Sequence, residues 1–271
     1  HSLRRRQRQM CIRDRGCPLI LGIKDDATYI ASDVAAIISE TNRLLYLEQG
    51  DLVVMQAGFI PFFSNLAGDI LTAAEIAAKI KISDLSLEKL DIGHYKHFML
   101  KEIFEQPLVI EKTAENALKN AFDAALFGPN AHHVFTKVKR IQILACGTSY
   151  FAGLVAKYWL ETIAKLPTSV EISSEYRYRD ILMEDGTMVI TISQSGETLD
   201  TIEAMKHALD KGAFASLAIC NVKESVLPRT SDCYFYTEAG IEVGVASTKA
   251  FTTQLTALFI LANSLAKTHL T

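Results

Sequence analysis

The chain has 271 residues, of which 49% are hydrophobic, and a formal net charge of −3. This length allows one large domain or two modest ones, and the charge gives no reason to expect a nucleic-acid partner. The five cysteines lack Cys-x-x-Cys spacing, which argues against a disulfide framework and a zinc site. No apolar run reaches the ~18 residues of a membrane span. We therefore expect a cytoplasmic protein with reduced thiols and no metal, cofactor or membrane partner.

Residues 1–16 are unusually basic, with six arginines and one acidic residue, Asp14. A basic arm for nucleic acid and an organelle transit peptide are two interpretations. The segment has no aromatic residue for base stacking and no apolar run, and Arg8–Arg15 resembles a translated sequencing adapter. We expect a non-native or disordered tail and leave it out of the fold argument.

Residues 17–92 show strand-like runs followed by a helical run, which is an α+β pattern. Two hairpins are expected, because pairs of apolar runs flank polar turn residues. The first hairpin joins 19–23 to 28–31, the second joins 44–47 to 52–55, and an Ala-rich helix spans 71–80.

Residues 93–130 are expected to link this part to the next through helices. A helix is expected over 94–110, where Pro107 should end or kink it, and 111–127 should continue as helix. Gly128-Pro129-Asn130 then marks a break.

From 131 to 271, apolar strands alternate with helices, which predicts a doubly wound α/β domain with a parallel sheet covered on both faces. In such sheets, ligands bind at the carboxyl ends of the strands. Strands are expected at 141–144, 169–172, 188–192, 215–219 and 233–236, and helices at 150–163, 198–211 and 248–265.

Two turns between a strand and a helix share one design. Cys146-Gly147-Thr148-Ser149 and Ser193-Gln194-Ser195-Gly196-Glu197-Thr198 each combine a glycine with hydroxyl residues. Glycine lets a ligand approach the backbone, and the start of a helix offers free N–H groups, so a phosphate can be held without lysine or arginine. The alternative is that these hydroxyls only cap helices. Neither turn matches the P-loop or the dinucleotide fingerprint, which favours a monophosphate over a nucleotide.

A third segment, Gly244–Lys249, precedes the last helix and should close over the same end of the sheet. Lys249 could form a Schiff base if its amine were desolvated. The alternative is an ordinary lysine in the first turn of a helix, with solvent or interface contacts.

The segments 145–149, 193–198 and 244–251 look like the first sugar isomerase (SIS) domain of the glutamine–fructose-6-phosphate aminotransferase family, and 174–179 and 218–222 also fit. The resemblance covers 131–271 and implies an SIS-type doubly wound sheet. It also implies that Val245 and Ser247 approach the sugar. The residues it places around the phosphate are Thr148, Ser149, Ser193, Gln194, Ser195 and Thr198.

The front half resembles the same family. Residues 30–33 and 47–51 look like the end of its amino-terminal-nucleophile glutaminase domain, and 101–107 look like its interdomain helix. By this resemblance, 17–92 is a partial glutaminase domain, and Asp33 binds the amino group of glutamine. From composition alone, Asp33 could equally be an ordinary turn residue.

Members of this family make glucosamine-6-phosphate and glutamate from fructose-6-phosphate and glutamine, for amino-sugar (UDP-N-acetylglucosamine) synthesis. The resemblance implies that turnover needs an amino-terminal cysteine nucleophile and a second SIS domain. Cys11 and Cys17 lack the family's context, so we expect no catalytic residue in this chain. We expect it to bind fructose-6-phosphate or glucosamine-6-phosphate as a homodimer, with glutamine used only by the full-length enzyme.

Two alternatives remain. One is a stand-alone SIS module that senses a phosphosugar, and the other is a related SIS deglycase or isomerase. A regulator would carry a helix-turn-helix domain, and the glutaminase-like hairpins favour the aminotransferase fragment instead.

Overall fold

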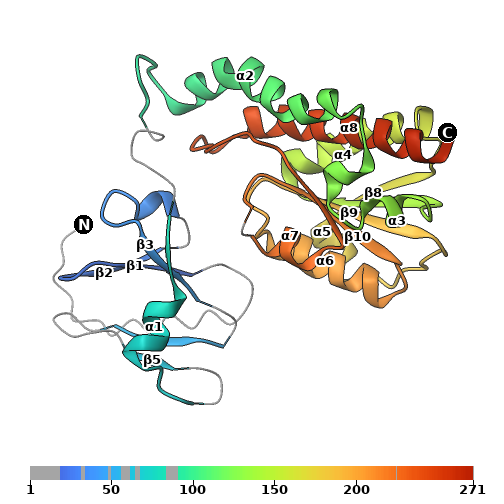
Figure 1. Cartoon of the computed structure of the whole chain (residues 1–271). Helices are drawn as coiled ribbons and strands as arrows, with labels where there is room; N and C mark the ends of the chain where they lie inside the picture. Colours follow the sequence, from blue (N-terminus) through green and yellow to red (C-terminus); the bar gives the residue numbers. More distant parts are fainter. Residues whose placement is uncertain are drawn as a thin grey trace. The chain divides into compact units, whose positions relative to one another are not determined.

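The computed structural model describes residues 19–31, 34–47, 50–55, 62–64, 68–83, 91–223 and 225–270. The chain divides into two compact units, His1–Lys89 and Leu90–Thr271, and each is described by itself (Figure 1). None of the helices in these ranges is long and apolar enough to cross a membrane.

The front unit contains a four-stranded antiparallel sheet in the order β2-β1-β3-β6. The expected first hairpin is confirmed, since β1 (Ile20–Ile23) pairs with β2 (Thr28–Ala31). The 3₁₀ helix η1 (Val34–Ala36) follows β2. Helix α1 (Ala73–Lys79) begins at a capping box formed by Thr72 and Glu75, and it leads directly into β6 (Ile80–Ile82).

The expected second hairpin is wrong. Strand β3 (Arg43–Tyr46) lies between β1 and β6, whereas β4 (Leu52–Val54) pairs with β5 (Phe62–Ser64) in a separate two-stranded sheet. Adjacent strand residues point to opposite faces, and Leu44 and Leu45 are both buried. A strand that is apolar on both faces suits the middle of a covered sheet better than an isolated hairpin.

The rear unit contains a five-stranded sheet in the order β11-β10-β9-β7-β8, and every neighbouring pair is parallel. This confirms the predicted doubly wound α/β fold. The strands are β7 (Arg140–Ala145), β8 (Thr168–Ile172), β9 (Thr187–Ser193), β10 (Ala215–Cys220) and β11 (Cys233–Tyr236).

Helices cover both faces of this sheet (Figure 1). One face carries α4 (Gly147–Thr162) and α8 (Lys249–Leu270). The other carries the short helices α5 (Ser173–Tyr176) and α7 (Val226–Thr230) and the longer α6 (Leu199–Asp210). Every residue of β9 and β10 is buried, as expected for central parallel strands.

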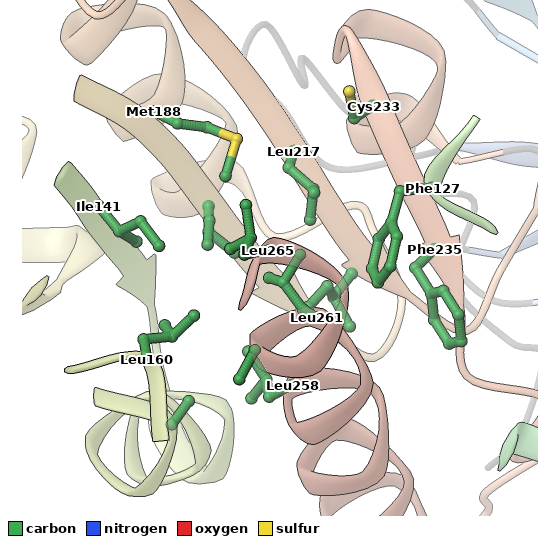
Figure 2. Packing of buried hydrophobic residues seen from close by; sticks show 14 of the residues in the cluster. Phe127, Ile141, Leu160, Met188, Leu217, Cys233, Phe235, Leu258, Leu261 and Leu265 are labelled. Atoms are coloured by element: carbon green, nitrogen blue, oxygen red, sulfur yellow. The ribbon is translucent and has the colours of Figure 1, made fainter. Parts of the chain in front are cut away.

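The larger core cluster lies under α4 and α8. Figure 2 shows Leu258 and Leu261 of α8 between Leu160 of α4 and the rings of Phe127 and Phe235. Phe127 ends the 3₁₀ helix η3 (Ala124–Phe127), which is followed by the short helix α3 (Ala131–Phe135). This packing holds α4 and α8 against the same face of the sheet.

Helix α2 (Phe98–Lys119) contacts α8 and runs along it (Figure 1). Pro107 was expected to end or kink the helix, and it does not end it, because one helix continues through it. Proline removes the N–H that would bond the carbonyl four residues earlier. Here the side-chain Nε2 of Gln106 donates to that carbonyl, on Ile103, at 3.0 Å, which restores the missing partner.

Candidate functional site

The two hydroxyl-rich turns follow β7 and β9, which are neighbours in the sheet. After β7 the chain crosses to β8 on one side, and after β9 it crosses to β10 on the other. The helices that follow, α4 and α6, pack on opposite faces. This is a topological switch point, the place where open parallel sheets bind ligands.

The first turn ends β7 and starts α4 without a side-chain cap. Cys146 is the N-cap residue and makes no capping hydrogen bond. Gly147 follows with φ +58°, a conformation that favours glycine. Thr148 is exposed and Ser149 is buried, and both lie in the first turn of α4. The free N–H groups of this helix start therefore remain available to an anion.

The second turn is held by its own hydroxyls. The Oγ of Ser193 accepts a hydrogen bond from the N–H of Gly196 at 3.0 Å and lies 3.0 Å from the Oγ1 of Thr198. The Oγ of Ser195 accepts from the N–H of Glu197 at 3.1 Å. Thr198 is the N-cap residue of α6, but its side chain does not cap the helix. A hydroxyl that accepts a hydrogen bond can still donate its own hydrogen to a ligand.

Two acidic residues near the start of α6 are engaged elsewhere. Asp200 forms an ion pair of 2.7 Å with Arg177. The Oε1 of Glu197 accepts from the N–H of Val226 at 2.9 Å, and burial raises the pKa of the Glu197 carboxyl. Both arrangements reduce the repulsion that an anion would meet at this helix terminus.

Asn221 connects the second turn to the loop of residues 237–248, which joins β11 to α8 and leads into the third segment, a role the sequence did not reveal. Its N–H donates to the carbonyl of Gln194 at 3.1 Å. Its side chain donates to the carbonyl of Gly240 at 2.6 Å and accepts from the N–H of Ala239 at 2.8 Å. The sequence feature that could have indicated this role is an asparagine directly after an apolar strand, within the segment 218–222 that resembles the SIS family.

The third segment, Gly244–Lys249, is the last part of the loop that joins β11 to α8, up to the first residue of α8. Val245 is fully exposed and Ser247 is partly buried. Lys249 is 5% exposed, and its Nζ lies 2.7 Å from the Oε2 of Glu105 on α2. The ion pair with Glu105 engages this buried amine, which favours the alternative of a lysine in the first turn of a helix with interface contacts, here to α2.

The remaining candidate residues are not among the described residues of this site, and the cavity at the other edge of the sheet is separate from it. Asp33, Cys11 and Cys17 fall outside the described residues. A cavity of about 190 Å³ is lined by residues that include Arg140 and Thr187. These residues start β7 and β9, so the cavity lies at the opposite edge of the sheet from the hydroxyl-rich turns.

Comparison with known proteins agrees with this geometry. The SIS domain family matches residues 134–264. These residues are an SIS domain. The similarity to known proteins extends beyond this domain. Over 259 residues, 96% of its length, the chain is 54% identical to the glutamine–fructose-6-phosphate aminotransferase (isomerizing) of Neisseria meningitidis serogroup A, and the chain covers 42% of that protein.

Solved structures of related proteins are also similar to this chain. The C-terminal domain of glucosamine-fructose-6-phosphate aminotransferase from Francisella tularensis is 51% identical, with a TM-score of 0.62 over 65% of this chain and 49% of that one. Glucosamine-6-phosphate deaminase from Thermotoga maritima is 22% identical, with a TM-score of 0.52 over 63% of this chain and 49% of that one, which shows a shared fold alone. The chain is thus homologous to part of an aminotransferase, and it spans less than half the length of the curated relatives that it matches.

Proposed function

We propose that the SIS domain binds a sugar phosphate, fructose-6-phosphate or glucosamine-6-phosphate, at the carboxyl ends of β7 and β9. The observation that carries this proposal is the pair of helix starts without side-chain caps, α4 and α6, at one switch point. The phosphate would lie against them, with Val245 and Ser247 beside the sugar. The side chains proposed for the phosphate are those of Thr148, Ser149, Ser193, Gln194, Ser195 and Thr198.

We also propose that the chain works as part of an aminotransferase that takes nitrogen from glutamine. The similarity to the Neisseria enzyme runs over 259 residues, well beyond the SIS match at 134–264. This favours the aminotransferase over a stand-alone SIS regulator or a deglycase. In this proposal 17–92 is part of a glutaminase domain in which Asp33 contacts glutamine, 93–130 links it to the SIS domain at 131–271, and the protein is a cytoplasmic homodimer.

Calorimetry on the full chain tests the site. Fructose-6-phosphate should bind and unphosphorylated fructose should bind far less, because the helix starts would then face no anion. The double variant Thr148→Val/Ser195→Ala removes two hydroxyl donors. Hydrogen bonds to a charged group contribute about 1.5–3 kcal/mol each, so affinity should fall at least about tenfold.

Thr162→Val is the matched control, because this hydroxyl donates to the carbonyl of Tyr158 at the far end of α4. It should leave the affinity unchanged. If fructose binds as well as its phosphate, or the double variant binds normally, the proposed site is wrong.

A further inference from the structure

A buried carboxylate on α2 holds the segment that leads into α8. Glu102 is 2% exposed. Its Oε1 accepts from the N–H of Val243 at 2.6 Å and from that of Gly244 at 3.1 Å, and its Oε2 lies 3.2 Å from the same Gly244 nitrogen. A buried carboxylate is tolerated when backbone donors satisfy its oxygens, so Glu102 and these two amides form one unit, here called the α2 clamp.

The α2 clamp depends on a glycine. A Cβ built on Gly244 would lie 2.5 Å from the Oε2 of Glu102 and 3.5 Å from the Cα of Met99. A larger residue would therefore displace either the Glu102 carboxylate or the segment, and both changes break the contact between them, since real Cβ contacts are not this short. Close backbone approach is one of the physical reasons for a glycine at a given position.

A second carboxylate holds the other end of the segment. The Oε1 of Glu242 accepts from the N–H of Thr248 at 2.8 Å and from that of Ala250 at 3.1 Å. These amides belong to the start of α8, whose free N–H groups favour a negative side chain. Only residues 245–247 lie between the two holding points, and Val245 is fully exposed there.

We infer that Glu102 is a positioning residue for the sugar end of the ligand, because it fixes the backbone that presents Val245 and Ser247. This inference rests on the proposed function of the site. Glu102 itself need not touch the ligand. The phosphate would be held independently by the turns after β7 and β9, which make no use of the α2 clamp.

The test separates the sugar from the phosphate. Glu102→Gln keeps the size of the side chain but turns an N–H₂ group toward a backbone N–H, so one acceptor is lost. In the full chain, calorimetry should show weaker fructose-6-phosphate binding, because part of the binding free energy must then order the displaced segment. Binding of inorganic phosphate should be unchanged, and amide hydrogen exchange at Val243 and Gly244 should become faster.

Glu115→Gln is the matched control on the same helix, because Glu115 is exposed and pairs with Lys119 one turn away. It should change none of these measurements. Gly244→Ala provides a second route to the same displacement if Glu102→Gln folds poorly, and it should show the same split between the two ligands.

Each result decides between the two proposals. Normal fructose-6-phosphate affinity in both variants would overturn the positioning role and leave the proposed site intact. Equal losses for fructose-6-phosphate and inorganic phosphate would also overturn it, because they indicate general damage. Failure of the unaltered chain to bind fructose-6-phosphate would reject the proposed function and this inference with it.

Discussion

The carboxylate of Glu197 accepts a hydrogen bond of 2.9 Å from the backbone N–H of Val226. The carbonyl of Gly196 accepts another, from Leu227, at 3.1 Å. The hydroxyl-rich turn before α6 is therefore tied to the short helix α7 after the neighbouring strand. Because the turn is braced by another segment, its shape should respond to changes that never touch a ligand.

Glu197 should make stability depend on pH. Burial raises its pKa above the ordinary value of 4.5, so folding favours the protonated form. This stabilisation is complete below the unfolded-state pKa and is lost as pH rises through the folded-state pKa. Glu197→Gln cannot ionise. The melting temperature of this variant, relative to that of the unaltered chain, should therefore increase as pH rises from 4 to 7. Glu203→Gln, on the exposed side of α6, should follow the unaltered chain, and a constant offset for Glu197→Gln would contradict the argument.

Glu197→Ala should behave differently from the glutamine variant. It leaves the N–H of Val226 without an acceptor, and a buried donor without a partner costs about 1–3 kcal/mol. Denaturant unfolding monitored by circular dichroism should show a loss of this size at pH 7. A loss as small as that of Glu203→Ala would show that water replaces the carboxylate.

Gly196→Ala should lower the free energy of unfolding far more than Gly240→Ala does, although the two glycines have nearly equal φ values of +68° and +67°. A Cβ on Gly196 would lie 2.0 Å from the Oγ of Ser225, whereas one on Gly240 meets nothing within 4 Å. The left-handed conformation costs both variants about 1–2 kcal/mol, and the clash should add about 1–3 kcal/mol at Gly196 alone. Equal unfolding free energies for the two variants would disprove the crowding.

Asn221→Ala should weaken fructose-6-phosphate binding and lower stability together. The change removes the acceptor for Ala239 and the donor for Gly240, which separates the loop of residues 237–248 from the turn after β9. We expect a loss of about 1–3 kcal/mol in the free energy of unfolding. Asn263→Ala loses only a bond to the carbonyl of Phe259 within α8 and serves as the control. If calorimetry finds normal binding for Asn221→Ala, this connection does not shape the site.

Alkylation should distinguish the three cysteines of the rear unit. Burial raises the pKa of the Cys220 thiol to about 11 and that of Cys233 to about 12. At pH 8 at most about one molecule in a thousand would carry the reactive thiolate at either site. Cys146 is only partly buried, at the start of α4, and should react first with iodoacetamide. Fructose-6-phosphate should slow that reaction.

Peptide-level mass spectrometry measures these rates and scores Cys11 and Cys17 separately. In denaturant all cysteines should react alike, which serves as the control. Labelling of Cys233 as fast as that of Cys146 in the folded protein would contradict the assigned burial.

The five strands of the parallel sheet and the long helices α4, α6 and α8 of the rear unit could be predicted because each is a short apolar run or an amphipathic segment bounded by glycine or polar residues, whereas the short helices α3, α5 and α7 were not predicted. The strand predicted at 233–236 matches β11 residue for residue. The hydroxyl-rich turns could be found for the same reason, since a turn that follows a parallel strand lies at the ligand-binding edge of the sheet.

Two expectations were not met. Pro107 was expected to end or kink a helix, but the helix does not end there, because the side chain of Gln106 satisfies the carbonyl that proline leaves free and α2 packs along α8. The second hairpin was expected because β3 and β4 are close in sequence. Strand β3 instead pairs on both edges, with β1 and β6, and both of its faces are buried, since Leu44 and Leu45 are each almost fully covered.

The sequence by itself determined the alternating fold, the place of the two turns and the resemblance to the aminotransferase family, because these depend on local pattern. Only the tertiary structure decided which groups hold those turns and the segment that leads into α8. Glu102 lies 142 residues from Gly244, and Asn221 and Glu197 act on segments that follow other strands. The hydrophobic periodicity of the sequence does not predict such contacts. They form only when a parallel sheet brings distant strand ends to one edge and helices pack against it.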